Sequence, residues 1–185
     1  MRRLFVFMMV SIDGYFEGVN HDFSWSNADN QEFEDFALEN LSNTDALVMG
    51  HRTYDVMETF WPTDEAKESD PRTAAFMTNT MKYVASRQGF EPEWENVTVK
   101  VGDPVAWVQE LKQADGKDIA ILASSELCVS LIEANVIDEY QIMYNPLALG
   151  AGTPVFNGLN HRVDFELLSS RPFKNGNVLL TYKRK

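Results

Sequence analysis

Short, unbroken apolar runs recur along this chain, and most of them lead through a turn into a segment with helical spacing. The first spans Leu4 to Val10, and shorter ones span Ala46 to Met49 and Ile119 to Leu122. Runs without polar alternation are typical of strands that are buried on both faces, as in a parallel sheet covered by helices. The pattern therefore predicts an α/β fold, with a mostly parallel central sheet and flanking helices.

The other elements are expected from their own spacing. Apolar residues recur every three or four positions in the helical segments, as with Phe33, Phe36 and Leu41 in the first of them. The segment 61–69 holds Pro62 and several charges, and is expected to be a loop. The expected helices cover 29–41, 53–60, 104–114 and 124–134, and further strands cover 83–86, 97–101 and 138–144.

The C-terminal part predicts an antiparallel hairpin. Its two arms run from Phe165 to Phe173 and from Val178 to Tyr182, around an Asn175-Gly176 pair that is typical of tight hairpin turns. No internal repeat, low-complexity tract or linker interrupts the sequence. One domain over residues 1–185 is expected, with the hairpin at the edge of its sheet.

Charge and cysteine content narrow the function classes. The formal net charge is −12, so nucleic acid and anionic membranes would be repelled and are not expected as partners. The single cysteine, Cys128, forms no internal disulfide, which fits a reducing cytoplasm. The apolar start is short and lacks a small-residue cleavage site, so it is interpreted as a first strand and not as a signal peptide.

Two kinds of catalytic centre find no support in the pattern. The three histidines, His21, His51 and His161, show no metal-ligand spacing among themselves or with Cys128. No G-x-S-x-G nucleophile motif occurs. Metalloenzyme and hydrolase functions are therefore not favoured.

A candidate anion-binding turn follows the second strand, where the run from Asp45 to Met49 stops at Gly50 and continues as His51-Arg52-Thr53. Glycine lets backbone approach a ligand closely, and a helix start offers unpaired N–H groups and the positive end of its dipole. With its basic side chains the stretch fits a nucleotide phosphate. A plain helix entry capped by the threonine explains it as well, and both interpretations stay open.

Two further strand ends carry suitable residues. Ser86 and Arg87 offer a hydroxyl and a guanidinium for a phosphate, although a solvated arginine is the simpler alternative. The helix that follows Leu122 opens as Ala123-Ser124-Ser125-Glu126, with Ser124 or Ser125 as its N-cap. Ligands of open α/β sheets bind at the carboxyl ends of the strands, so these turns become candidates for pyrophosphate binding.

Carboxylates near the same edge are candidates for substrate contact. Asp13 lies in a turn bracketed by glycines after the first strand, where an ordinary Asp-Gly turn is the simpler interpretation. Asp29 and Glu32 lie four residues before Phe33 and Phe36, and so share the inward helix face, where an acid can act as a proton donor. Both acids also suit a first helical turn for electrostatic reasons alone.

Four segments together resemble a known family. They are Val10–Gly14, Asp45–Tyr54, Leu131-Ile132 with Ile137–Tyr140, and Pro146 with Gly150–Phe156. In this order they resemble the dihydrofolate reductase-like family, specifically the reductase domain of the bacterial bifunctional riboflavin-biosynthesis deaminase-reductase. The resemblance covers nearly the whole chain, and the deaminase motifs are absent, so only reduction is implied.

The resemblance implies a dihydrofolate reductase-like fold and NADPH as cofactor. The 2′-phosphate and adenosine side would be held by Gly50-His51-Arg52-Thr53 and Ser86-Arg87, and the pyrophosphate by Ala123-Ser124-Ser125-Glu126. The family usually carries a pair of glycines at the last turn, where this chain has Ala-Ser-Ser. The Cβ atoms there would hinder close approach of backbone to a ligand.

The resemblance also implies a small-molecule substrate between the Asp13 turn, the first helix and the cofactor. Asp29 or Glu32 would match the carboxylate that dihydrofolate reductases place on that helix. The expected function is NADPH-dependent hydride transfer to a pterin- or pyrimidine-like heterocycle by a cytoplasmic homodimer. The alternative, motivated by the missing glycine pair, is a catalytically silent dimeric module that kept the fold and binds a nucleotide or other ligand.

Overall fold

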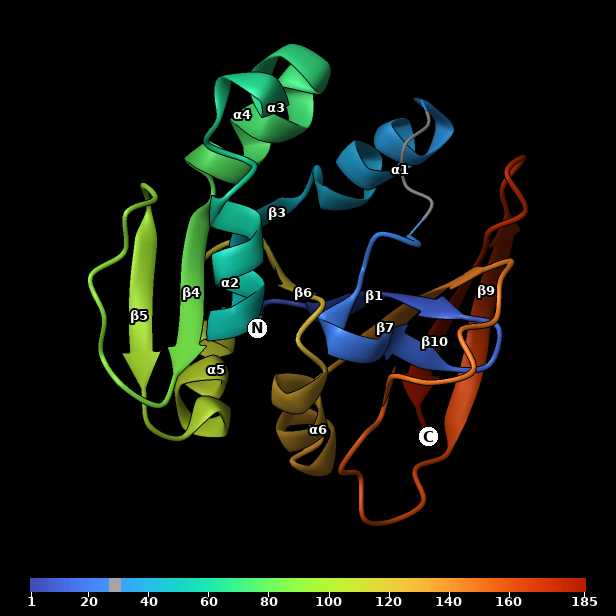
Figure 1. The fold of residues 1–185 in the computed structure, drawn as a ribbon. Helices are drawn as coiled ribbons and strands as arrows, with labels where there is room; N and C mark the ends of the chain where they lie inside the picture. Colours follow the sequence, from blue (N-terminus) through green and yellow to red (C-terminus); the bar gives the residue numbers. More distant parts are fainter. Residues whose placement is uncertain (27–30) are drawn as a thin grey trace.

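The computed structural model describes residues 1–26 and 31–185, and it is built around an eight-stranded sheet of order β5-β4-β3-β6-β1-β7-β10-β9 (Figure 1). All neighbouring pairs from β5 to β7 are parallel, while β10 runs antiparallel to both β7 and β9. The predicted parallel sheet with an antiparallel edge is confirmed. The strands of this sheet are β1 (Leu4–Ser11), β3 (Thr44–Gly50), β4 (Met81–Ser86), β5 (Val97–Val101), β6 (Asp118–Leu122), β7 (Glu139–Asn145), β9 (Phe165–Pro172) and β10 (Val178–Arg184).

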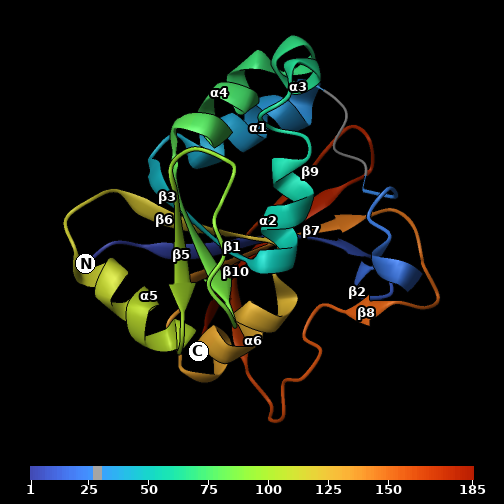
Figure 2. The same ribbon diagram turned by 60° about the vertical axis from the view of Figure 1, so that its left-hand side comes forward.

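Helices cover both faces of the sheet, with α5 and α6 on one side and α1 to α4 on the other (Figure 2). Alternate side chains of β1 explain why the strand is apolar throughout. Val6 and Met8 pack toward α5 and α6, whereas Phe5 packs toward α1, α2 and α4. The helices are α1 (Gln31–Leu41), α2 (His51–Glu58), α3 (Asp64–Ser69), α4 (Pro71–Asn79), α5 (Pro104–Gln113) and α6 (Ser125–Glu133).

The expected loop at 61–69 is wrong in its second half. Thr63 caps α3 by accepting a hydrogen bond from the backbone N–H of Ala66 at 3.2 Å, and Asp70 then caps α4, which begins with Pro71. Only Ala66 of α3 is buried, so this helix has no apolar periodicity from which to predict it. The sequence signals for these two helices are their capping residues, Thr63 and Asp70.

Two further strands form a separate hydrogen-bonded sheet, which lies to the right of α2 in Figure 2. It pairs β2 (Tyr15–Glu17) with β8 (Thr153–Pro154), and a short 3-10 helix, η1 (Val19–His21), follows β2. Gly152 has φ +142°, and a Cβ there would collide with the carbonyl oxygen of Glu17. Glycine at this position thus permits the close approach of the two segments.

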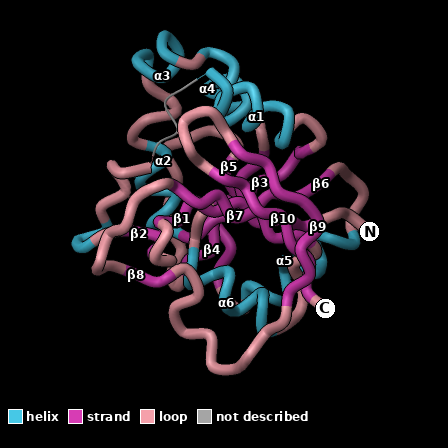
Figure 3. Tube along the Cα trace, turned by 90° about the vertical axis from the view of Figure 1, so that its right-hand side faces the viewer, coloured by secondary structure: helices cyan, strands magenta, loops and turns pink. Residues whose placement is uncertain are grey.

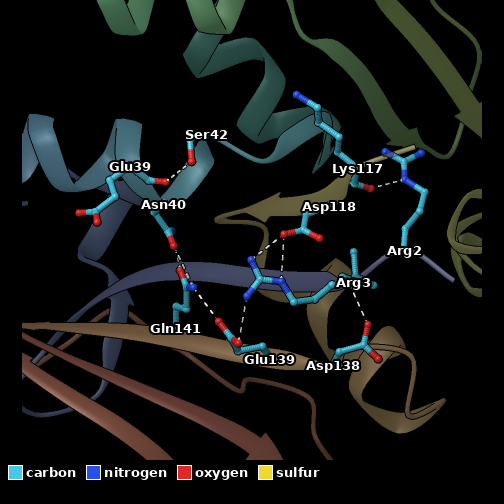
Figure 4. Close-up of polar contacts among 11 residues, drawn as sticks. Arg2, Arg3, Glu39, Asn40, Ser42, Lys117, Asp118, Asp138, Glu139 and Gln141 are labelled. Atoms are coloured by element: carbon cyan, nitrogen blue, oxygen red, sulfur yellow. Dashed lines mark hydrogen bonds and ion pairs between the residues drawn. The ribbon is translucent and has the colours of Figure 1, made fainter. Parts of the chain in front are cut away.

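Polar side chains tie the strands together at the end of the sheet where the parallel strands begin (Figure 4). The Arg3 guanidinium donates to Asp118 at 2.7 Å and to Glu139 at 3.2 Å, which joins β1 to β6 and β7. Asn40 of α1 and Gln141 of β7 exchange two amide hydrogen bonds. The opposite, carboxyl end of the strands is where the candidate site lies.

The hairpin closes the fold at one edge. Its arms are β9 and β10, and the Asn175-Gly176 turn connects them with Gly176 at φ +91°, as predicted. Seen from this side, β9 runs along the outer edge of the sheet (Figure 3). Within the described part of the chain, no helix combines the length and the apolar character needed to cross a membrane.

Candidate functional site

One open cleft of about 1020 Å³ lies at the carboxyl ends of β3, β4, β5 and β6. Parallel strands place their following turns at a common edge, and so turns that are distant in the sequence meet here. The cleft brings together nine of the ten predicted cofactor residues; Ala123 alone does not line it. Its lining consists of Gly50–Thr53, Ala85–Phe90, Val101, Gly102, Pro104, Ser124–Leu127 and Ser130.

Ser124 joins two of these turns through its hydroxyl. The oxygen accepts from the Gly50 N–H at 2.8 Å, lies 2.9 Å from the Thr53 hydroxyl and donates to the Leu122 carbonyl at 3.0 Å. Ser124 occupies the N-cap position of α6, but its hydroxyl makes no capping bond to that helix. The side chain thus fixes the start of α2 against the start of α6.

The backbone at the missing glycine pair is unusual. Ala123 has φ 54° and Ser124 has φ 65°, so both non-glycine residues lie in the left-handed region. This conformation is disfavoured for residues with a Cβ and is easily adopted by glycine. The turn therefore has a glycine-like shape without glycine, and the hydrogen bonds of Ser124 hold it.

The start of α2 carries an aromatic pair beside the turn after β4. The imidazole of His51 stacks on Phe90 with centroids 4.0 Å apart and planes at 6°. Its Nδ1 lies 3.2 Å from the Ser86 hydroxyl, and its Nε2 lies 3.4 Å from a carboxylate oxygen of Asp55. The Ser86 hydroxyl and the His51 imidazole thus lie side by side at the edge of the cleft.

The mouth of the cleft has one loosely paired cation. Arg87 is almost fully exposed, and its guanidinium lies 3.8 Å from the carboxylate of Glu126 in the first turn of α6. An exposed pair at this distance contributes little stability and rearranges readily. Arg87 is therefore available to an anionic ligand, while Glu126 places a negative charge beside the same helix start.

Arg52 is engaged differently. Its Nη2 donates to both carboxylate oxygens of Glu17, at 3.0 and 3.1 Å. Glu17 is only 5% exposed and also binds His21 and Thr153. Burial by itself raises the pKa of Glu17, but the hydrogen bonds from His21 and Thr153 and the charge of Arg52 together lower it below its ordinary value.

Of the predicted substrate carboxylates that the structure describes, Asp13 and Glu32 do not line the cleft. Asp13 accepts hydrogen bonds from the backbone N–H groups of Leu149 and Gly150, and its bond from the Ser11 hydroxyl lowers its pKa most. Glu32 accepts from the backbone N–H of Lys174 at 3.0 Å. Asp29 lies outside the residues that the structure describes.

Sequence reasoning missed the role of Glu17. Its partners come from η1, α2 and β8, which no local pattern connects. The one sequence signal for Glu17 was its place beside Gly18, in the turn bracketed by glycines. Phe90 was missed for the same reason, since its stacking partner lies in another turn.

Comparisons with known proteins bear on the family and the fold of this chain. The family model described as RibD C-terminal domain matches residues 2–179. The chain is 27% identical over 183 residues to YyaP of Bacillus subtilis (strain 168), covering 98% of this chain and 94% of that protein.

Two solved structures show the likeness of fold. A protein assigned to riboflavin biosynthesis from Shewanella sp. PV-4 superimposes with a TM-score of 0.77 at 24% identity, covering 99% of both chains. The dihydrofolate reductase of Enterococcus faecalis, complexed with NADP(H), does so with a TM-score of 0.66 at 15% identity, covering 99% of this chain and 96% of that one. The fold is therefore dihydrofolate reductase-like, as the sequence resemblance implied.

Proposed function

This chain belongs to the RibD C-terminal domain family, and on that premise we propose that it is an NADPH-dependent reductase of a small pterin- or pyrimidine-like heterocycle. One observation carries the proposal. The starts of α2 and α6 and the turn after β4 line a single cleft at the carboxyl edge of the sheet. Two helix starts that face one space favour an anionic ligand there.

The residues of the cleft fit a dinucleotide phosphate. Its volume of about 1020 Å³ is at the upper end of the range for ligand sites. Ser86, Arg87 and His51 would hold the 2′-phosphate end, and the N–H groups at Ser125 and Glu126 would face the pyrophosphate. When bound, NADPH supplies the hydride, and the protein binds and orients both reactants.

On the substrate side we propose that Asp13, with Asp29 or Glu32, orients or protonates the heterocycle. Asp13 already fixes the loop at Leu149 and Gly150 against the end of β1, so it also shapes that side of the site. Glu32 does the same for the hairpin turn through Lys174. A carboxylate with a spare lone pair can accept a further bond from a ring N–H.

We also propose that the chain acts as a cytoplasmic homodimer. All but the first residue of edge strand β9 are exposed, including Leu167 at 53% and Leu168 at 47%. Exposed edge strands with apolar side chains are sites of association. Sedimentation equilibrium should give a dimer that Leu167→Lys dissociates, and a monomeric wild type would contradict this part of the proposal.

A second candidate is a nucleotide-binding module without activity. It is favoured by Asp13 and Glu32, whose carboxylates already bind backbone N–H groups. It is also favoured by Glu126, which puts a like charge beside the proposed pyrophosphate. Such a module would bind a nucleotide but would not turn it over.

The test is consumption of NADPH by the purified protein with a panel of pterins, flavin precursors and quinones. The proposal expects NADPH oxidation that depends on a pterin or a flavin precursor. Binding of NADPH without oxidation by any of them would favour the inactive module. If the protein neither binds nor oxidises NADPH, both candidates are contradicted.

A further inference from the structure

Glu17 is a buried carboxylate that the proposed reduction does not use. Its oxygens bind side chains from three separate segments: His21 of η1 at 2.9 Å, Thr153 of β8 at 2.8 Å and Arg52 of α2 at 3.0 Å. The side chains of His21 and Arg52 are half exposed, so the buried anion is anchored by groups that reach in from the surface. A buried carboxylate is costly in free energy unless it is paired and hydrogen-bonded, and these three side chains provide that pairing.

The pairing uses the cation that the sequence pattern assigned to a phosphate. Arg52 lines the cleft, but its guanidinium already faces both oxygens of Glu17. Turning it toward a ligand phosphate would leave Glu17 buried with only His21 and Thr153. Removal of one partner from a buried ion pair is strongly destabilising, so this exchange is unfavourable.

Arg87 differs from Arg52 in its exposure and in the strength of its ion pair. It is 95% exposed in its side chain, its nearest carboxylate is 3.8 Å away, and that carboxylate is itself 81% exposed. It exchanges a solvated partner for a phosphate at little cost. Of the two arginines that line the cleft, Arg52 is therefore held in place, whereas Arg87 can turn toward a ligand.

We propose that Glu17 is a positioning residue that holds Arg52 as a strap between β2 and the start of α2, and that this strap retains the nucleotide without contacting its 2′-phosphate. The inference rests on the proposed nucleotide site. It assigns discrimination of NADPH from NADH to the Arg87 side of the cleft. It assigns the residence time of either nucleotide to the Glu17–Arg52 pair.

The geometry supports a strap because the pair links the small β2–β8 sheet directly to the start of α2, while Phe16 of β2 packs separately in the main core. Glu17 belongs to the small β2–β8 sheet, whereas Arg52 belongs to a helix packed on the main sheet. Gly152 brings β8 against the backbone of Glu17, so movement of Glu17 would carry β8 with it. Opening of the pair would therefore release Glu17 and the segment paired with it from the start of α2.

The experiment measures dissociation rates of NADPH and NADH by stopped-flow nucleotide fluorescence. Glu17→Gln and Arg52→Met are each expected to speed dissociation of both nucleotides by the same factor, roughly tenfold. The double variant should dissociate no faster than either single one, because both changes break the same link. Arg87→Met is the matched control, and should weaken NADPH binding while leaving NADH unchanged.

Thr153→Val provides a milder variant, because it removes one hydrogen bond from Glu17 and leaves Arg52 in place. It should speed dissociation of both nucleotides by a smaller factor. A selective effect of Arg52→Met on NADPH would overturn the proposal, because it would make Arg52 a phosphate ligand. Selective tightening of NADPH by Glu17→Gln, unchanged dissociation rates or additive effects in the double variant would overturn it as well.

Failure of the proposed function has a different signature. If the wild-type protein binds neither nucleotide at equilibrium, the nucleotide site is refuted and the strap is refuted with it. If wild type binds both nucleotides and the variants dissociate at the wild-type rate, only the strap is refuted.

Discussion

The hydroxyl of Ser124 offers the sharpest test of the turn that replaces the glycine pair. Ser124→Ala removes its bonds to Gly50, Thr53 and Leu122 but retains a Cβ at φ 65°. Gly50 is half-buried at the edge of the cleft, so its N–H loses a protein partner without being cut off from water. Each lost hydrogen bond costs about 0.5–1.5 kcal/mol, so the variant should lose about 2 kcal/mol of unfolding free energy.

Ser124→Gly removes the same bonds but relieves the left-handed conformation. That conformation costs a residue with a Cβ about 1–2 kcal/mol, part of which is offset by the greater freedom of glycine in the unfolded chain. The glycine variant should therefore be about 1 kcal/mol more stable than the alanine variant. The sign of this difference follows from the backbone at residue 124 and not from the lost bonds.

Urea unfolding of both variants measures the difference, provided that the two share one m-value. Ser130 in the interior of α6 is the matched control, because glycine in a helix is about 1 kcal/mol less stable than alanine. The order of the two substitutions should thus reverse between the two positions. Equal stabilities at 124, or alanine above glycine there, would refute the left-handed turn.

Three further predictions concern buried and charged groups. Lys82 is fully buried and donates to the carbonyls of Met77, Thr78 and Thr80. Lys82→Met should therefore lower the free energy of urea unfolding by about 3 kcal/mol, and a loss below about 1 kcal/mol would contradict this role. Glu126→Gln removes a like charge from the start of α6 and should tighten pyrophosphate binding about threefold by calorimetry; weaker binding would argue against an anion site there. Because the pKa of Glu17 is lowered in the folded protein, wild type should be more stable than Glu17→Gln above about pH 4.5. This advantage should disappear as the pH falls through the lowered pKa. A difference in unfolding free energy that does not depend on pH would count against a buried anion.

The sheet was predictable because burial on both faces leaves a direct trace in the sequence. The apolar runs Leu4–Val10 and Ala46–Met49 lie within β1 and β3 for this reason, and the Asn175-Gly176 pair sets the hairpin turn. The α3 helix was not predictable from periodicity, since only Ala66 of it is buried. The β2 and β8 strands are too short to carry an alternation.

The candidate site was predictable as a set of turns but not as a set of contacts. Parallel strands place Gly50, Ser86 and Ser124 at one edge whatever their separation in sequence. The pairing of Arg52 with Glu17 depends on how the small sheet packs beside α2, which no local pattern encodes. The sequence therefore assigned Arg52 and Arg87 the same role, and the structure places them in different surroundings.

Thermal unfolding with each nucleotide tests most directly whether this cleft selects NADPH. At a concentration about 100-fold above its Kd, a ligand adds about 2.7 kcal/mol to the unfolding free energy, so NADPH should raise the Tm well above the value reached with equal NADH. Arg87→Met should reduce the NADPH shift to that of NADH. An equal rise with both nucleotides, or no rise with either, would contradict this selectivity.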